Sequence, residues 1–388
     1  MRFRGGRHLL VAIALVAGAC GGESTAKTTL APTTTTTVAP ATTTTSSATT
    51  SSPPTPSTTS TTTTTTTTAA DSSSVWSRVP HDEAVFGEGG PITYGVTAGG
   101  PGLVAVGSDG SDDGGLDAAV WTSPDGITWS RVPHDETTFS GGGDLVMRSV
   151  IAGGPGLVAV GSDWSGDDVV AAVWTSPDGI TWSRVPHDES VFGGGGDQLM
   201  ASVTAGGPGL VAVGSDYLGD GAGAVVWTSP DGIAWSRVPH DEAVFGGEHS
   251  PQMYGVTAGG PGLVAVGSDG GFRAVVWSSP DGITWSRVPH DEPIFGGEGL
   301  PVMNSVTAGG PGLVAVGSDQ PFDSANNNAA VWTSPDGITW SRVPHDEAVF
   351  GGEGDYVMVS VTAGGPGLVA VGSDSGLGVA VWVKAAED

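Results

Sequence analysis

The chain has 388 residues, of which 65 are Gly and 27 are Pro, and this share of helix-breaking residues disfavours long helices. Only 13 Lys and Arg stand against 41 Asp and Glu, so the formal net charge of −28 excludes the basic surface of nucleic-acid-binding proteins and disfavours contact with an anionic membrane surface. The single cysteine, Cys20, excludes a disulfide framework and a cysteine-based metal cluster.

Residues 1–20 predict an export signal. Three arginines precede residues 9–19, an apolar run shorter than the roughly 20 residues that span a bilayer. The small residues before Cys20 resemble the lipobox of bacterial lipoproteins, although that family prefers Leu or Val at the position of Ala17. The resemblance implies a lipid on Cys20, which would be the only membrane attachment, and a location at the outer face of the cell membrane. The alternative is an ordinary secretory signal with an incidental cysteine, which leaves the protein secreted.

Residues 21–74 predict a disordered linker. They consist mainly of Thr, Ser, Ala and Pro and contain no aromatic residue. Such a segment cannot bury enough apolar surface to offset the entropy of ordering the chain. We interpret it as a spacer between the anchor and a domain, and its threonines are candidates for O-glycosylation.

From residue 75 the chain repeats one unit, whose four predicted strands we label a to d. In the first complete unit these strands are residues 93–98, 103–107, 118–123 and 127–132, separated by turn residues. An equivalent tryptophan recurs at intervals of 53, 53, 53, 50 and 55 residues, a period typical of propeller blades. These tryptophans are Trp76, Trp129, Trp182, Trp235, Trp285 and Trp340.

The two ends of the repeat region predict how a ring would close. Residues 75–79 match a strand d with no a, b or c before it, and the last unit ends at Val383 after its strand c. We therefore predict an all-β fold, a six-bladed β-propeller of four-stranded antiparallel blades over residues 75–384. Its N-terminal strand would become the outer strand of the last blade, which leaves no open sheet edge. Residues 385–388 would form a short tail.

The c–d turn resembles the Asp-box, the bacterial neuraminidase repeat, whose pattern is Ser-x-Asp-x-Gly-x-Thr-Trp. Residues 123–129 read Ser-Pro-Asp-Gly-Ile-Thr-Trp, which is one residue shorter between Ser and Trp. Kelch propellers are a weaker match. The resemblance implies a structural carboxylate that accepts backbone N–H groups across the turn. These aspartates are Asp125, Asp178, Asp231, Asp281 and Asp336.

Sialidase activity does not follow from this resemblance. Sialidases place three arginines around the substrate carboxylate, whereas six arginines here share one repeat position on the predicted outer strand, along tryptophan faces. Only Arg148 and Arg273 lie elsewhere in the repeat region. The sequence also has no Ser/His/Asp set, no histidines at metal-binding spacing and no phosphate-binding loop. We therefore predict no catalytic residues, no enzyme activity and no cofactor.

Two further patterns have both a chemical and a structural interpretation. The sequence Pro-His-Asp-Glu occurs six times, first at residues 80–83. Its residue types suit metal binding or acid–base chemistry, but six equal copies favour a loop cap, in which a carboxylate accepts backbone N–H groups and the following Phe fills the seam. The acidic loop 109–117 offers oxygen ligands for calcium. Other units lack it, so we favour a solvated loop and predict no metal site.

The units differ from one another mainly in the b–c loops and just before strand a. In a propeller these two sets of loops open on the same face, so divergence there indicates contact with a ligand, and the alternative is drift of unconstrained loops. Exposed aromatic residues beside polar groups suit carbohydrate or protein contacts. The candidate ligand-face residues are Tyr94, Arg148, Trp164, Tyr217, Tyr254, Phe272, Arg273, Phe322 and Tyr356.

These patterns together predict an exported, lipid-anchored and monomeric propeller. We expect it to act as a binding or scaffolding module for a glycan or for an envelope or extracellular protein. One alternative is a sialidase-like glycan hydrolase with a site at the axis, and another is a structural spacer in the cell envelope.

Overall fold

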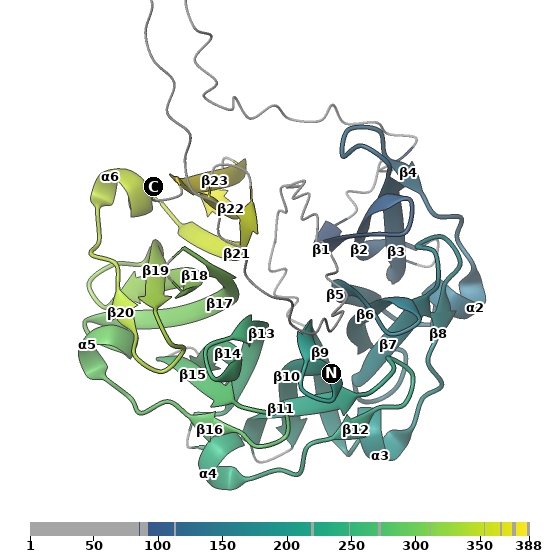
Figure 1. Cartoon of the computed structure of the whole chain (residues 1–388), viewed down its shortest axis with the longest axis horizontal. Coiled ribbons are helices and arrows are strands. Elements are labelled where there is room, and N and C mark those ends of the chain that lie inside the picture. The colour runs from purple at the N-terminus through teal and green to yellow at the C-terminus, as the bar shows by residue number, and fades with distance from the viewer. Residues whose placement is uncertain are drawn as a thin grey trace, which may run out of the picture. The chain divides into compact units, whose positions relative to one another are not determined.

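The computed structural model describes residue 85 and residues 92–385, apart from 112–113, 219–220, 248, 271–272, 311, 353, 365–366 and 375–377. Six antiparallel sheets form a ring of blades, as the repeat predicted (Figure 1). Five sheets have four strands, and the sixth has three strands within the described residues. None of the described helices is long and apolar enough to cross a membrane.

Each blade runs outward from the axis in the order a, b, c, d. The innermost strands a are β1 (Ile92–Gly99), β5 (Leu145–Gly153), β9 (Gly196–Gly206), β13 (Pro251–Gly259), β17 (Gly299–Gly309) and β21 (Tyr356–Gly364). Strands b are β2 (Gly102–Gly110), β6 (Gly156–Asp163), β10 (Gly209–Leu218), β14 (Gly262–Asp269), β18 (Gly312–Pro321) and β22 (Gly367–Asp374). Strands c are β3 (Leu116–Ser123), β7 (Val170–Ser176), β11 (Gly221–Ser229), β15 (Ala274–Ser279), β19 (Asn328–Ser334) and β23 (Gly378–Ala385).

The outer strands are shorter than the sequence suggested. Strands d are β4 (Ser130–Arg131), β8 (Ser183–Arg184), β12 (Ser236–Arg237), β16 (Ser286–Arg287) and β20 (Ser341–Arg342). The predicted strand 127–132 begins only at Ser130, because the carboxylate of Asp125 accepts the backbone N–H groups of Ile127 and Thr128. Those two groups are therefore not available to a strand ladder.

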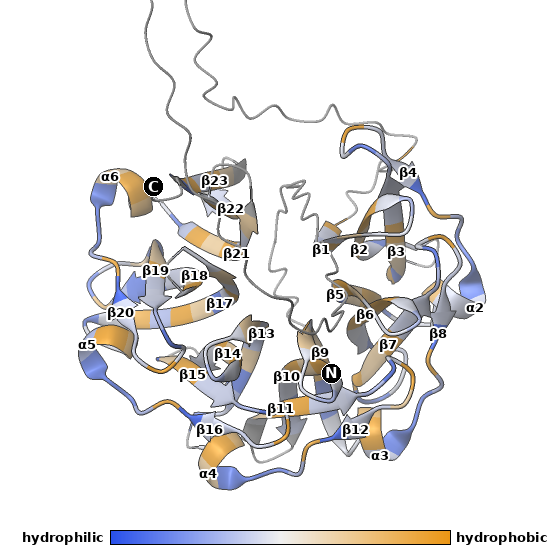
Figure 2. Ribbon diagram, viewed as in Figure 1, coloured by the Kyte–Doolittle hydropathy of each residue, from blue (hydrophilic) through white to orange (hydrophobic). Residues whose placement is uncertain are grey.

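Short helices follow the outer strands, which strand patterning did not predict. They are α2 (Glu136–Phe139), α3 (Glu189–Phe192), α4 (Glu242–Phe245), α5 (Glu292–Phe295) and α6 (Glu347–Phe350). Each is one turn long and combines hydrophilic with hydrophobic residues (Figure 2). The hydrophobic end carries the phenylalanine, which is buried in α2 to α5.

The hydrophobic core consists of seams between neighbouring blades. In the seam between the second and third blades, Val158 and Val173 from one blade pack with Met200, Leu210 and Trp227 from the next. The strand-c tryptophan of each blade also donates its indole N–H to the segment before that blade, as Trp174 does to the carbonyl of Thr138 in α2 (2.9 Å). The strand-c tryptophans therefore pack between blades.

The predicted closing strand lies outside the described residues. The edge of β23 exposes Val381 and Val383, 40% and 46% of whose surfaces face solvent. At the other end, Trp121 donates its indole N–H to the carbonyl of Val85 (3.0 Å), which is the contact that Trp174 makes one repeat later. Since Val85 comes six residues after Val79, the end of the predicted N-terminal strand d, we propose that residues 75–79 pair with β23.

Deleting residues 75–80 should therefore lower the melting temperature by about 5 °C or more, because the last blade would keep an open edge. Deleting residues 65–70, which lie in the Thr-rich segment, is the matched control and should leave the melting temperature unchanged. Differential scanning calorimetry measures both. Equal melting temperatures for the two deletions would contradict this closure.

Candidate ligand-binding face

The two faces of the ring are built from different loops. On one face the a–b turn of a blade packs on the c–d turn of the next, so closely that a Cβ atom on Gly100 would strike the carbonyl of Asp178. On the other face, Leu116 at the end of a b–c loop donates its backbone N–H to Asp144 Oδ1 (3.0 Å), which lies just before the next strand a. The b–c and d–a loops therefore share a face, which we call the variable face.

Each innermost strand carries a one-residue β-bulge at the same place. A bulge changes the direction of a side chain within a sheet, and the innermost strands surround the axis of the ring (Figure 1). The six blades carry five different residue types at this position. The bulged residues are Tyr94, Arg148, Ala201, Tyr254, Asn304 and Val359.

Arg148 is an unusual cation in this acidic chain. Its guanidinium carbon lies 5.7 Å from the centre of the Tyr94 ring, within the range of a cation–π contact. Its Nε is buried and has no hydrogen-bond partner among the described residues. Burial lowers the pKa of Arg148, and Tyr94 and Tyr217 are the groups that counteract this effect. An arginine nevertheless keeps its charge at physiological pH.

Tyr217 lies near this guanidinium, and Tyr254 lies near Tyr217. The Tyr254 hydroxyl donates to Gln252 Oε1 (2.9 Å) and lies 3.3 Å from Ser268 Oγ. Burial raises the pKa of Tyr254 and also that of Tyr217, which interacts with both Tyr254 and Arg148. Both phenols are therefore neutral at physiological pH. We call Tyr94, Arg148, Tyr217 and Tyr254 the axial cluster.

The other predicted face residues lie elsewhere. Trp164 and Phe322 are exposed in b–c loops of the second and fifth blades, and Tyr356 begins β21. Arg273 follows β14 and has its Nε 4.0 Å from Glu292 Oε2. Phe272 and Cys20 lie outside the described residues. The structure thus brings together four of the candidates that divergence between blades had singled out.

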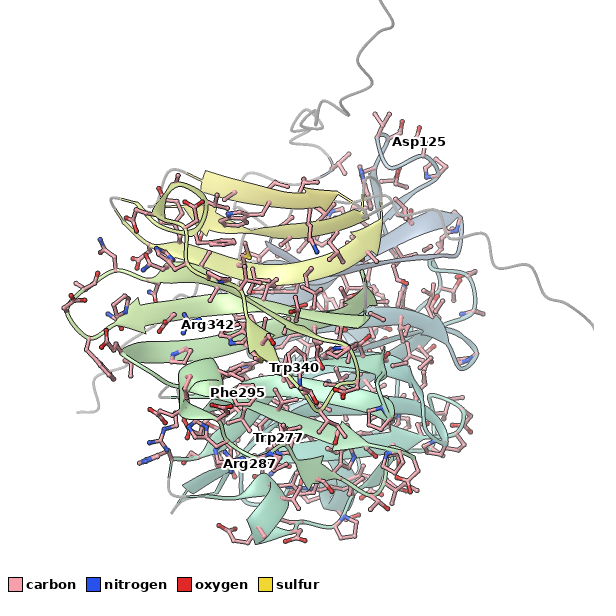
Figure 3. The ribbon with its side chains drawn as sticks, turned by 60° about the vertical axis from the view of Figure 1, so that its left-hand side comes forward. Asp125, Trp277, Arg287, Phe295, Trp340 and Arg342 are labelled. Carbon is pink, nitrogen blue, oxygen red and sulfur yellow. The ribbon has the colours of Figure 1, made fainter. Side chains whose placement is uncertain are left out.

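The repeated arginines of strand d have a structural role that sequence reasoning described only in part. Four of them stack over the strand-c tryptophan, at 5.6–6.0 Å from the ring centre, as predicted. Figure 3 shows this arrangement for Arg287 and Trp277. Sequence reasoning missed that four of the repeated arginines, including Arg237 and not Arg287, pair with the last residue of the repeated Gly-Ser-Asp on strand b. The pairs are Arg131–Asp109, Arg184–Asp163, Arg237–Asp216 and Arg342–Asp319.

The aspartates of the c–d turns are hydrogen-bonded within the turn. Asp125, at the tip of its hairpin in Figure 3, accepts the backbone N–H groups of Ile127 (2.8 Å) and Thr128 (2.6 Å) and the Thr128 hydroxyl (3.1 Å). These bonds from Thr128 and Ile127 lower the pKa of Asp125. The same contacts recur at Asp178, Asp281 and Asp336.

The Pro-His-Asp-Glu segments cap the short helices. Asp188 accepts the backbone N–H of Ser190 (2.9 Å) at the start of α3, and His187 pairs with Glu189 (3.0 Å). Asp291 has no such bond, because Pro293 has no N–H to donate. These contacts match the loop-cap interpretation. In the part of the chain that the structure describes, no group of three His, Cys, Asp or Glu side chains is arranged to hold a metal ion.

Solved structures match the fold at low identity. A putative 6-phosphogluconolactonase from Bacteroides uniformis is 13% identical over 74% of this chain and 80% of that chain, with a TM-score of 0.44. The periplasmic gluconolactonase of Pseudomonas aeruginosa is 12% identical over 76% and 83%, with a TM-score of 0.45. A family 117 glycoside hydrolase from Zobellia galactanivorans is 12% identical over 60% and 77%, with a TM-score of 0.36. At these values the likenesses assign no substrate to this chain.

Comparisons at the level of sequence find no relatives. No protein-family model matches the chain, and no curated protein matches it. The Asp-box resemblance therefore rests on the sequence of the turn and its hydrogen bonds.

One expectation from the sequence is corrected by the solved structures. The chain was expected not to be an enzyme, but the matching structures are described as lactonases and a glycoside hydrolase. The fold therefore gives no ground for excluding catalysis, and the missing sialidase arginines exclude only one mechanism. The expectation was too broad because it treated the absence of familiar catalytic residue sets as the absence of every possible catalytic site.

Proposed function

We propose that the domain is a binding module that takes a carboxylate-bearing ligand at the axial cluster. The observation that carries this proposal is Arg148, a partly buried guanidinium that has no hydrogen bond or ion pair among the described residues. The chain has 41 acidic residues, so an arginine with a purely structural role is expected to form an ion pair with one of them. The four repeated arginines named above do have one.

The chemistry of the axial cluster fits an acidic ligand. A guanidinium presents paired N–H donors that match the two oxygens of a carboxylate. The neutral phenols of Tyr217 and Tyr254 add hydrogen-bond donors and flat apolar surfaces of the kind that sugar rings pack against. Because the scaffold is a ring of hydrogen-bonded strands, the cluster is held in place before the ligand arrives, which reduces the entropic cost of binding.

Replacing Arg148 by methionine should weaken the binding of D-glucuronate by about ten- to a hundredfold, the value of a hydrogen bond to a charged group. Binding of D-glucose, which has the same ring without the carboxylate, should not change. Arg148→Lys should retain part of the affinity, because lysine keeps the charge but not the paired donors. Isothermal titration calorimetry measures these affinities.

Arg273→Met is the matched control, since Arg273 belongs to the variable face but not to the axial cluster, and it should bind glucuronate normally. Unchanged glucuronate binding by Arg148→Met would refute the assignment. The same variants are incubated with 4-nitrophenyl glucuronide, so that turnover would be seen as released nitrophenol. Turnover that depends on Arg148 would make the cluster part of a hydrolytic site.

We also propose that the domain is exported and held at the membrane by a lipid on Cys20, on the basis of the sequence of residues 1–20. Replacing Cys20 by serine should move the protein from the membrane fraction to the soluble fraction, because a serine hydroxyl does not receive the lipid. Immunoblots of the two fractions measure this shift. A wild-type protein that is already soluble after export would rule out the anchor.

A further inference from the structure

The fourth blade breaks a pattern that four other blades share. In the first, second, third and fifth blades the aspartate that ends the Gly-Ser-Asp of strand b pairs with the arginine of strand d. In the fourth blade the corresponding residues, Asp269 and Arg287, do not form this pair. Asp269 is only 8% exposed, and its Oδ1 has no hydrogen-bond partner among the described residues. A buried carboxylate oxygen without a partner is costly, so a ligand that supplies one is favoured.

The third blade shows what fills the corresponding space. There Asp216 and Arg237 pair with each other, and the side chain of Gln198 bonds to both, with its Nε2 donating to Asp216 Oδ1 (2.9 Å) and its Oε1 accepting from Arg237 (3.0 Å). Gln198 is fully buried. Its amide thus satisfies a carboxylate with its N–H and a guanidinium with its carbonyl.

The register places Pro251 at the same position in the fourth blade. Gln198 pairs across strands with Asp216, and Pro251 pairs with Asp269. Proline has no amide side chain to lie between the charges. The fifth blade also has a proline here, Pro301, but its aspartate pairs with Arg342. Of the third, fourth and fifth blades, only the fourth therefore lacks both the glutamine side chain and the Asp–Arg ion pair.

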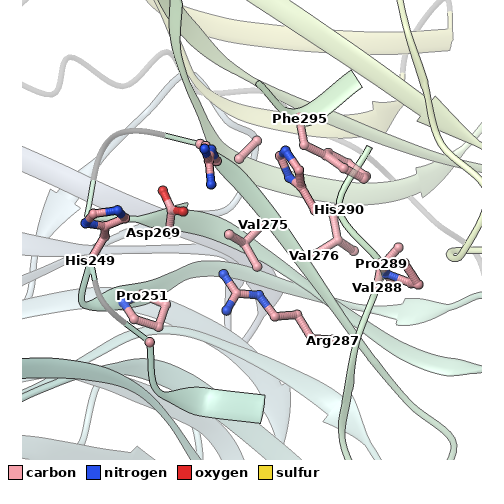
Figure 4. Close-up of a pocket in the computed structure, with 13 residues that line it drawn as sticks. His249, Pro251, Asp269, Val275, Val276, Arg287, Val288, Pro289, His290 and Phe295 are labelled. Carbon is pink, nitrogen blue, oxygen red and sulfur yellow. The ribbon is translucent and has the colours of Figure 1, made fainter. Parts of the chain in front are cut away.

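A cavity of about 420 Å³ occupies this place, a volume within the usual range for small-molecule sites. Asp269, Arg287 and Pro251 all line this cavity (Figure 4). Val275 and Phe295 contribute apolar surface to its wall, and Arg273 contributes a second guanidinium. We call this cavity the blade-4 pocket. It opens among His249 of the d–a loop and Arg273 of the b–c loop, so it belongs to the variable face.

We propose that the blade-4 pocket binds the acetamido group of an N-acetylated amino sugar. The amide carbonyl of the ligand accepts from the Arg287 guanidinium, and its N–H donates to the Asp269 carboxylate, as the Gln198 amide bonds to both Arg237 and Asp216. The acetyl methyl group lies against Val275 and Phe295. A simple anion would match Arg287 and Arg273 but would be repelled by Asp269, whereas an amide satisfies both charges.

The test compares N-acetyl-D-glucosamine with D-glucosamine and D-glucose by isothermal titration calorimetry on the whole chain. We expect the acetylated sugar to bind at least tenfold more tightly than either of the others. Acetamide should compete, but more weakly, because it lacks the ring. Equal affinities for the three sugars would overturn the proposal. If free glutamine binds as tightly as the acetylated sugar, the pocket recognises an amide and the assignment to a sugar is wrong.

Pro251→Gln places the glutamine of the third blade in the fourth blade, where its amide should fill the pocket. We expect this variant to lose at least tenfold in affinity for N-acetylglucosamine while its melting temperature stays the same or rises. The matched control is Pro301→Gln, the same substitution at the same register in the fifth blade, and it should bind normally. Retained binding in Pro251→Gln would refute the proposal.

A second variant covers the case in which Pro251→Gln fails to fold. Asp269→Leu removes the carboxylate whose Oδ1 has no hydrogen-bond partner among the described residues and should also lose binding of the acetylated sugar. Unimpaired binding by this variant would equally refute the proposal. Arg148→Met, in the axial cluster, should leave this binding unchanged, so the blade-4 pocket and the axial cluster are tested independently.

Discussion

Replacing Gly161 by alanine should lower the free energy of unfolding by at least about 3 kcal/mol, because the new methyl group has no space. A Cβ atom at Gly161 would overlap the carbonyl oxygen of Val146, which lies on β5 just before the bulge at Arg148. Gly161 is hydrogen-bonded into the sheet between β5 and β7, so neither chain can move aside. The same overlap would occur in the other blades, at Gly107, Gly214, Gly267, Gly317 and Gly372.

Gly110→Ala is the matched control for this prediction. Gly110 ends β2, and a Cβ atom there would meet no atom within 4 Å, so we expect a change of less than about 0.5 kcal/mol. Urea denaturation measures both variants. Similar stabilities for Gly161→Ala and the wild type would show that the bulge can rearrange, which would also weaken the claim that it holds Arg148 in place.

Replacing Trp227 by alanine should cost about 4 kcal/mol of stability, near the middle of the range for large aromatic residues in a core. The Trp227 side chain is fully buried in the seam between the second and third blades. Its indole N–H donates to the carbonyl of Val191 in α3 (2.7 Å). Truncation therefore leaves a cavity and also leaves that carbonyl without its partner.

Trp164→Ala provides the comparison for Trp227→Ala, since Trp164 is 47% exposed on the variable face. We expect a loss of less than about 1 kcal/mol from this change. Chemical denaturation of both variants separates the two roles. A small effect at Trp227, comparable with that at Trp164, would mean that the seams between blades contribute less to stability than their burial indicates.

Both proposed sites arise where one blade departs from the others. The repeated residues build the scaffold: turn aspartates, helix caps, and arginines stacked on tryptophans. The axial cluster uses Arg148 and tyrosines at positions where other blades carry Ala201 or Val359. The blade-4 pocket lies beside Pro251, where Asp269 and Arg287 do not form the ion pair of the four other blades named above. The residues that the blades share thus stabilise the fold, and residues that differ in single blades form the two proposed sites.

The sequence by itself determined the number of blades, the order of strands and the local contacts. The period of the tryptophans sets the size of a blade, and short-range chemistry sets the turns, since Asp125 bonds to residues only two and three positions away. Interactions of this kind need no knowledge of the rest of the chain. The bonds of the repeated aspartates are of this local kind, whereas the helices that they cap and the shortness of strand d were not foreseen.

Only the tertiary structure decided which divergent residues act together. The bulges depend on the register between strands a and b, which alternation of residue types does not specify. The Asp–Arg pairs join residues 21–23 positions apart, and the Gln198–Arg237 bond joins residues 39 apart. The missing Asp–Arg ion pair of the fourth blade depends on such contacts across three strands. A local pattern shows Pro251 as an ordinary strand residue, and only the packing of the blade shows that it lines a cavity together with Asp269 and Arg287.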